Sequence, residues 1–107
     1  MPEKRKHIHL IGIGGTGLSA IAKVLLEQGH IVSGSDMHRS PLATSIEKDG
    51  ATVFIGHDTK NIEGAEMIIM SSAIPASNPE LIAANDSGIP VFKRSSFLKE
   101  WLVDQDC

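Results

Sequence analysis

The 107-residue chain has few of the residues that mark several large classes of protein. Its single cysteine, Cys107, is the last residue, so the chain cannot form an internal disulfide and suits a reducing compartment. Tyrosine is absent and aromatic residues make up only 4% of the chain, which argues against a surface that stacks nucleobases. No apolar run approaches the roughly 20 residues of a membrane span, and the N-terminus has no signal-peptide core. These absences predict a cytoplasmic protein without a membrane partner.

The charge balance argues against nucleic acid as a partner. The net charge of −3 and the isoelectric point of about 5.9 leave no basic face of the kind that binds polyanions. The one basic cluster, at residues 4–6, precedes the first apolar run, and we expect a flexible tail over residues 1–6. The remaining length suits one domain, which we place at residues 7–103.

No catalytic motif and no metal-binding cluster stands out in the sequence. There is no G-x-x-x-x-G-K-[ST] loop for a nucleoside triphosphate, no C-x-x-C and no G-x-S-x-G. Four histidines have no partner at the spacing of a metal site, and we interpret them as structural: His7, His9, His30 and His38. The chain is therefore expected to have neither catalytic residues nor a metal of its own.

Apolar runs alternate with helical patterns along the chain. The runs at 7–11, 31–34, 52–55, 67–70 and 91–92 predict strands, and the patterns at 16–28, 41–49 and 79–87 predict helices, with a last helix capped by Ser95 or Ser96. The only direct link between two strands, 56–66, is expected to hold a degenerate helical turn. This order predicts a Rossmann-like three-layer α/β/α domain with a parallel, five-stranded, doubly wound sheet.

A glycine-rich segment joins the first predicted strand to the first predicted helix. Gly12, Gly14 and Gly17 form a G-x-G-x-x-G, the pattern that binds pyrophosphate on backbone N–H groups at the start of a helix. Gly12 is expected to make the tight turn, Gly14 to let phosphate approach the backbone, and Gly17 to let helix and strand pack closely. Gly15 and the hydroxyl of Thr16 complete the predicted phosphate site. The alternative is that these glycines serve only a tight turn.

Polar residues follow the second predicted strand. Asp36 lies about 20 positions after Gly17, where an acidic residue accepts hydrogen bonds from ribose hydroxyls. A carboxylate there disfavours a 2′-phosphate, so the pattern favours NAD or a uridine nucleotide over NADP. The alternative is that Ser35 or Asp36 only caps the chain before Ser40.

Two further segments follow the third and fourth strands. His57 is expected to hydrogen-bond a base or a phosphate if it is functional, although a histidine in such a place is more often a surface or turn residue. The segment after the fourth strand is expected to face the glycine loop and hold a diphosphate from the other side, with ordinary turn formation as the alternative. Its predicted site residues are Ser71, Ser72, Ala73, Ile74 and Asn78.

Taken together, several segments resemble the N-terminal domain of the Mur ligases over roughly residues 7–102. They are 8–20 (IHLIGIGGTGLSA), 32–36 (VSGSD), 55–57 (IGH), 71–74 (SSAI) and 78–80 (NPE). Within the family the match is best to the enzymes that add L-alanine to UDP-N-acetylmuramic acid, and the murein-peptide ligases have a similar domain. The joint order of these segments is more specific than any one motif.

The resemblance implies a three-domain enzyme of bacterial peptidoglycan synthesis. Its first domain binds the UDP part of the substrate, its central domain binds ATP and Mg²⁺, and its third helps to bind the amino acid. By this analogy Gly14 to Gly17 hold the diphosphate, Ser71 to Ile74 line its other side, and Ser35, Asp36 and His57 lie near the uridine.

The chain stops at Cys107, about where the central domain begins in the family, so we expect an excised, non-catalytic first domain without a cofactor of its own. Its expected partners are UDP-N-acetylmuramic acid and the other two domains of the same protein. The alternatives are an NAD-binding module of an oxidoreductase, a nucleotide sensor, and an interaction domain without a ligand.

Overall fold

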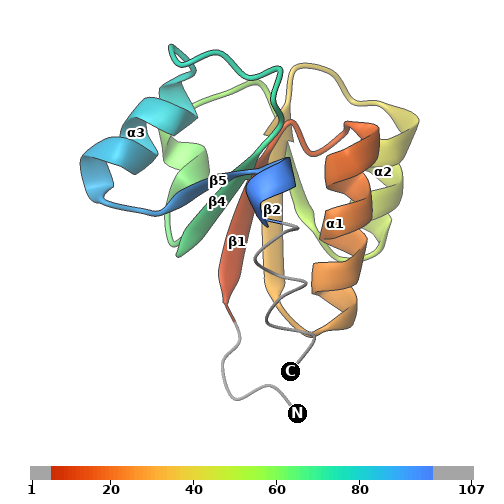
Figure 1. Ribbon diagram of the computed structural model, residues 1–107. Helices are drawn as coiled ribbons and strands as arrows, with labels where there is room; N and C mark the ends of the chain where they lie inside the picture. Colours follow the sequence, from red (N-terminus) through yellow and green to blue (C-terminus); the bar gives the residue numbers. More distant parts are fainter. Residues whose placement is uncertain (1–5, 98–107) are drawn as a thin grey trace.

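The structure, a computed structural model, describes residues 6–97 of the chain (Figure 1). Strands and helices alternate along this part of the chain. In chain order they are β1 (His7–Ile11), α1 (Thr16–Glu27), β2 (Ile31–Asp36), α2 (Pro41–Lys48), β3 (Thr52–Ile55), the 3₁₀ helix η1 (Thr59–Ile62), β4 (Met67–Met70), α3 (Pro79–Ser87) and β5 (Val91–Lys93).

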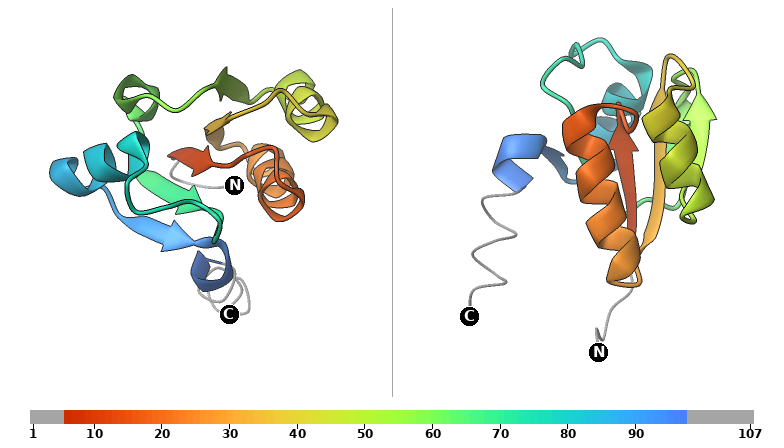
Figure 2. Two further views of the ribbon diagram at one scale, coloured as in Figure 1. Left: turned by 90° about the horizontal axis from the view of Figure 1, so that it is seen from above. Right: turned by 90° about the vertical axis from the view of Figure 1, so that its right-hand side faces the viewer.

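The strands form one parallel sheet in the order β3-β2-β1-β4-β5. Helices α1 and α2 cover one face, and α3 and η1 lie on the other (Figure 2). The predicted Rossmann-like, doubly wound fold is therefore confirmed. The chain runs outward from β1 to β3 and then returns to place β4 on the other side of β1. This reversal between β1 and β4 is the point where such sheets bind ligands, at the carboxyl ends of the strands.

Each face of the sheet has its own apolar core. Ile8 and Leu10 of β1 pack with α1 and α2, whereas Ile11 packs with Leu81 and Ala84 of α3. Successive side chains of a strand point to opposite faces, so the alternation within β1 decides which residues meet α3. Because His9 shares the face of Ile11, the sheet carries a buried polar group on the side of α3 and η1.

Local signals explain where the helices begin and end. Ser40 caps α2 by accepting a hydrogen bond from the Ala43 N–H at 3.1 Å, with a proline in the first turn. Asn78 caps α3 in the same way, and Gly88 ends α3 in the left-handed region with φ of 76°. The caps and stops predicted for these two helices are confirmed.

The structure can be compared with the predicted bounds of one strand, one helix and one link. Strand β2 continues to Asp36, because Ser35 and Asp36 pair with Phe54 and Ile55 of β3. The helix after β5 already begins at Arg94, ahead of the predicted caps Ser95 and Ser96. The link 56–66 holds the short helix η1, as expected. The predicted tail, the rest of the last helix and the predicted domain end at 103 fall largely or wholly outside the described residues.

Within residues 6–97, none of the helices is both long enough and apolar enough to cross a membrane.

Candidate functional site

The glycine loop forms a compact turn that is tied to strand β2. The N–H groups of Gly12 and Ile13 both donate to the carbonyl oxygen of Ser35, at 2.8 and 3.0 Å, and the Gly15 N–H donates to the Gly12 carbonyl at 2.9 Å. Gly12 has a φ of +92°, a conformation that glycine adopts without strain. The tight turn predicted at Gly12 is therefore confirmed.

Asp36 holds the middle of this loop. Its Oδ2 accepts a hydrogen bond from the Gly14 N–H at 2.8 Å, and its Oδ1 accepts one from the Met37 N–H at 2.8 Å. A Cβ atom at Gly14 would lie 2.8 Å from both Asp36 Oδ2 and Ser40 Oγ. A side chain at position 14 would therefore displace Asp36 or Ser40, a reason for glycine that the sequence did not give. Each carboxylate oxygen keeps a second lone pair for a ligand.

Helix α1 begins at this loop without a side-chain cap. Its N-cap residue is Gly15 and its first turn has no acidic residue, whereas side chains cap the other helices that have assigned bounds. The first N–H groups of a helix have no partner within the helix, and they carry its positive partial charge. The start of α1 therefore offers backbone donors to an anion at the carboxyl edge of the sheet.

Arg94 lies against the first turn of α1. A Cβ atom at Gly17 would lie 2.6 Å from Arg94 Cδ and 2.8 Å from Arg94 Nε. Glycine at position 17 thus permits the close approach of Arg94, the residue that follows β5, to the first turn of α1. A cation is unfavourable at the positive end of a helix, and none of the ion pairs among residues 6–97 involves Arg94. An anion bound between Arg94 and α1 would relieve this repulsion.

The turn after β4 packs against the glycine loop. The Ser71 N–H donates to the Ile11 carbonyl at 3.2 Å, and the turn closes through a bond from the Ile74 N–H to the Ser71 carbonyl at 3.1 Å. A Cβ atom at Gly12 would lie 3.3 Å from Ser71 Cβ and 3.6 Å from Ile74 Cδ1. The Ser71 hydroxyl accepts a hydrogen bond from the Ala73 N–H at 3.2 Å. The segment therefore also forms an ordinary turn, which was the alternative to a ligand contact. Ser72 and Ala73 are exposed beside the loop.

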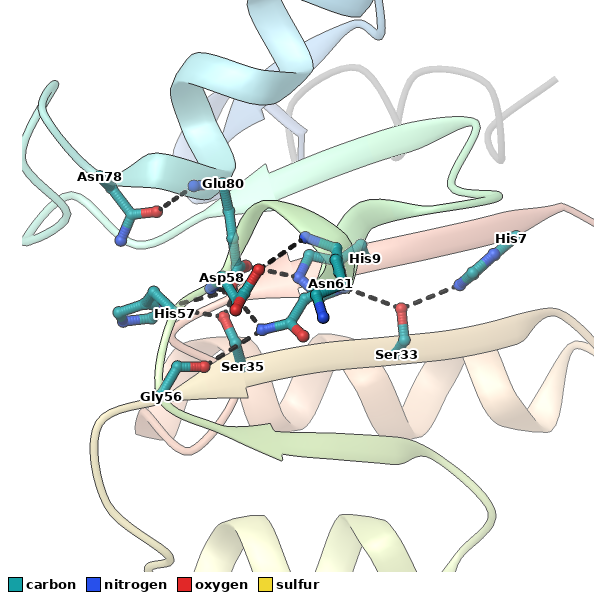
Figure 3. Close-up of polar contacts among 11 residues, drawn as sticks. His7, His9, Ser33, Ser35, Gly56, His57, Asp58, Asn61, Asn78 and Glu80 are labelled. Atoms are coloured by element: carbon teal, nitrogen blue, oxygen red, sulfur yellow. Dashed lines mark hydrogen bonds and ion pairs between the residues drawn. The ribbon is translucent and has the colours of Figure 1, made fainter.

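A buried carboxylate lies beneath these loops. Glu80, on α3, is fully buried, and Figure 3 shows polar groups from several elements converging on it. Its Oε1 accepts hydrogen bonds from Ser35 Oγ and His9 Nε2, both at 2.7 Å. Its Oε2 accepts bonds from Asn61 Nδ2 at 2.8 Å and from the Asp58 N–H at 3.1 Å. Glu80 thus ties α3 to β1, to β2 and to the segment after β3.

Burial by itself raises the pKa of Glu80. Hydrogen bonds from His9, Ser35 and Asn61, together with the charge of His9, outweigh this effect and lower the pKa to about 2. Glu80 is therefore ionised at neutral pH although it has no contact with water. In the part of the chain that the structure describes, every buried side-chain nitrogen and oxygen has a hydrogen-bond partner.

The polar contacts extend from Glu80 in two directions. Toward the carboxyl edge, Ser35 Oγ lies 2.9 Å from His57 Nδ1. Toward the other edge, Ser33 Oγ lies 2.8 Å from His9 Nδ1 and 2.9 Å from His7 Nε2. We call these seven residues the Glu80 network: His7, His9, Ser33, Ser35, His57, Asn61 and Glu80 (Figure 3). The structural interpretation of His7 and His9 is confirmed.

Two predicted site residues face inward. The side chain of Ser35 is fully buried between Glu80 and His57, and that of Asn78 is 5% exposed and caps α3. We therefore revise the expectation that they contact a ligand directly, because each supports the loops from beneath. His57 reaches the carboxyl edge with 11% of its side chain exposed. The hydroxyl of Thr16 is outside what the structure describes.

Sequence reasoning missed Glu80 and Arg94 as parts of this site. In the sequence, Glu80 belongs to an Asn-Pro-Glu segment that is typical of the start of a helix, and nothing in that local pattern indicates a buried carboxylate. Arg94 follows the last strand, where the rule that ligands lie beyond strand ends could have drawn attention to it.

Residues 6–97 contain no group of three or more His, Cys, Asp or Glu side chains arranged to hold a metal.

The fold and the loop at its carboxyl edge place the chain among the Rossmann-like α/β domains. The family model described as "Mur ligase family, catalytic domain" matches residues 7–105, and the chain belongs to the Mur ligase family.

Relatives within the family agree with this assignment. The chain is 47% identical to the UDP-N-acetylmuramate–L-alanine ligase of Persephonella marina over 97 residues, which are 91% of this chain and 21% of that protein. It is similar in structure to UDP-N-acetylmuramate-alanine ligase MurC from Thermotoga maritima, with a TM-score of 0.90, 28% identity and coverage of 94% of this chain and 23% of that one. A murein peptide ligase from Psychrobacter arcticus gives a TM-score of 0.82 and 28% identity, over 89% of this chain and 20% of that one. The chain thus spans about a fifth of the length of these relatives.

Proposed function

We propose that this chain is the UDP-binding domain of a UDP-N-acetylmuramate–L-alanine ligase in the bacterial cytoplasm. The observation that carries the proposal is the uncapped start of α1, with Arg94 against its first turn and the Ser71–Ile74 turn against the glycine loop that precedes it. The identity of 47% to a ligase with this name supports the choice of substrate. In the proposed enzyme the domain holds UDP-N-acetylmuramic acid while other domains join L-alanine to its carboxyl group.

The diphosphate is assigned to the start of α1. Backbone N–H groups of the first turn, near Gly17, and the guanidinium of Arg94 supply positive charge, and the Ser71–Ile74 turn lies against the glycine loop before α1. The Gly12–Gly15 turn serves mainly as the scaffold, because the N–H groups of all four of its residues already have acceptors within the protein. The proposal also includes the contact of the Thr16 hydroxyl with the phosphates that the sequence predicts.

The uridine is assigned to the side of β2, beside Asp36 and His57. Asp36 has lone pairs left for ribose hydroxyls, and His57 is the part of the Glu80 network that reaches this edge. The sequence has no loop of the P-loop type, so ATP and Mg²⁺ are assigned to the other domains of the ligase. The proposed partners of this domain are therefore its substrate and those domains.

A titration with three ligands tests the proposal. Isothermal calorimetry is expected to detect binding of UDP-N-acetylmuramic acid and of UDP, and no binding of NAD at the same concentrations. The physical reason is that the proposed site has one position for a diphosphate and one for a nucleoside, whereas NAD carries a second nucleoside for which the described residues offer no assigned position. Binding of NAD without binding of UDP would support the alternative, an NAD-binding module, and would refute the proposal.

Arg94→Ala tests the assignment of the diphosphate. The affinity for UDP is expected to fall about 10- to 100-fold, because a hydrogen bond to a charged group contributes about 1.5–3 kcal/mol. Lys93→Ala is the matched control, since Lys93 is a neighbouring exposed cation that ends β5 and is not near Gly17 in the described contacts. The affinity for uridine, which has no phosphate, should stay the same in both variants. An equal loss for uridine and UDP would mean that Arg94 acts on the fold and not on the phosphates.

A further inference from the structure

His57 occupies a special position in the Glu80 network. Glu80, Ser35 and His9 are fully buried, whereas His57 lies where the network reaches the carboxyl edge of the sheet, and 11% of its side chain is exposed. Its imidazole contacts the network through one nitrogen only, Nδ1 (Figure 3). What the other nitrogen offers to a ligand depends on which nitrogen carries the hydrogen.

The ionised state of Glu80 decides the direction of the hydrogen bonds. A carboxylate only accepts, so the single hydroxyl hydrogen of Ser35 points to Glu80 Oε1, 2.7 Å away. The Ser35 oxygen can then only accept from His57 Nδ1, at 2.9 Å, and Nδ1 must carry a hydrogen. Glu80 Oε2, 3.5 Å from the same nitrogen, favours this arrangement as well.

The opposite nitrogen of His57 is therefore free of hydrogen in the neutral imidazole. Nε2 lies across the ring from Nδ1, so it faces away from Ser35 and Glu80. The same accounting at His9 gives an Nε2–H bonded to Glu80, while Nδ1 contacts Ser33. Ser33 and Ser35 thus orient different histidines on the two sides of Glu80.

We propose that Glu80, acting through Ser35, is a positioning residue that fixes His57 with hydrogen on Nδ1 and presents Nε2 to the nucleoside as a hydrogen-bond acceptor. This inference rests on the proposed function, because it assigns the acceptor to the uridine position. The ligand must then supply a donor. In a uridine nucleotide the donors are the ribose hydroxyls and the ring N3–H of uracil.

The first experiment measures the tautomer without any ligand. In the ¹⁵N-labelled chain at alkaline pH, long-range ¹H–¹⁵N correlation spectra should show His57 with a protonated Nδ1 and an unprotonated Nε2. Glu80→Gln and Ser35→Ala should both increase the share of hydrogen on Nε2, and Ser35→Ala provides a test that leaves the carboxylate in place. Ser33→Ala is the matched control, because Ser33 contacts only the other arm, and it should leave His57 unchanged. A wild-type His57 with hydrogen on Nε2, or an unchanged tautomer in both test variants, would overturn the inference.

The second experiment identifies the donor. Affinity for UDP should fall about 3- to 10-fold in Ser35→Ala, the effect of one neutral hydrogen bond, and should be unchanged in Ser33→Ala. The donor is the group whose loss weakens binding in the wild-type chain and weakens it less in Ser35→Ala: the base N3–H if this holds for N3-methyl-UDP, and the ribose hydroxyls if it holds for 2′,3′-dideoxy-UDP. Weaker binding of 2′,3′-dideoxy-UDP that is the same in Ser35→Ala reports on Asp36 and not on His57. Equal binding of all three ligands would refute the acceptor role of Nε2. A chain with the expected tautomer that does not bind UDP would instead refute the proposed function.

Discussion

Replacing Glu80 with alanine is expected to lower the free energy of unfolding by about 3–5 kcal/mol, the usual cost of removing one partner from a buried charged pair. The variant leaves His9 Nε2 without its acceptor in a buried site, and it removes an acceptor from Asn61 Nδ2 and from the Asp58 N–H, which are partly buried. Urea unfolding followed by circular dichroism measures the effect. A loss below about 1 kcal/mol would mean that water replaces the carboxylate at little cost.

The pH dependence of stability is a second test of this prediction, and replacement of an exposed glutamate, Glu47, is its control. The pKa of Glu80 is about 2 in the folded protein and 4.5 in the unfolded chain, so its contribution is complete above pH 4.5 and is lost as the pH falls toward 2. The wild-type chain should lose stability in that window more steeply than Glu80→Ala. Glu47→Ala removes an exposed partner of Arg39 and should cost less than about 1 kcal/mol.

Gly14→Val is expected to lower the affinity for UDP at least about 100-fold while the domain stays folded, with overpacking costing about 1–3 kcal/mol of stability. The new Cβ atom would lie 2.8 Å from Asp36 Oδ2 and Ser40 Oγ, so both side chains must move. Asp36 would then release the Gly14 N–H, and the loop before α1 would lose its anchor on β2. Calorimetry with UDP measures the loss, and circular dichroism checks that the fold is retained.

Gly29→Ala separates loss of stability from loss of binding. Gly29 has a φ of +90° at the other end of α1, with no heavy atom within 4 Å of a Cβ placed there. Alanine in that conformation should cost about 1 kcal/mol and leave the affinity for UDP unchanged. If Gly14→Val binds UDP within a few-fold of the wild-type chain, the glycine loop is only a turn and the diphosphate site lies elsewhere.

The parts of the fold that were predicted from the sequence depend on local signals. A run of apolar residues before Gly12 and a helical pattern after Gly17 were sufficient to predict a strand, a turn and a helix, and the structure has all three. Capping residues predicted where α2 and α3 begin. The contact between the glycine loop and the Ser71–Ile74 turn was predictable too, because parallel strands end at the same edge of a sheet.

The Glu80 network was not predictable because it depends on register and on long-range pairing. His9 and Glu80 are 71 residues apart, and Ser35 and Glu80 are 45 apart. A shift of β1 by one residue would turn His9 to the face of α1, and no local pattern reports that choice. The hydrogen bond that the Gly14 N–H donates to Asp36 and the contact of Arg94 with Gly17 depend in the same way on how distant segments meet.

The position of Glu80 after β4 has a consequence for how this domain folds during synthesis. The first three strands and both helices on one face emerge from the ribosome before α3, yet β1 is a central strand whose second neighbour is β4. Until residue 80 has emerged, His9 and Ser35 on the sheet have no carboxylate to bind. A shorter nascent chain therefore lacks both a strand pairing and the acceptor for its buried polar groups, so stable folding of this domain must await the emergence of β4 and α3.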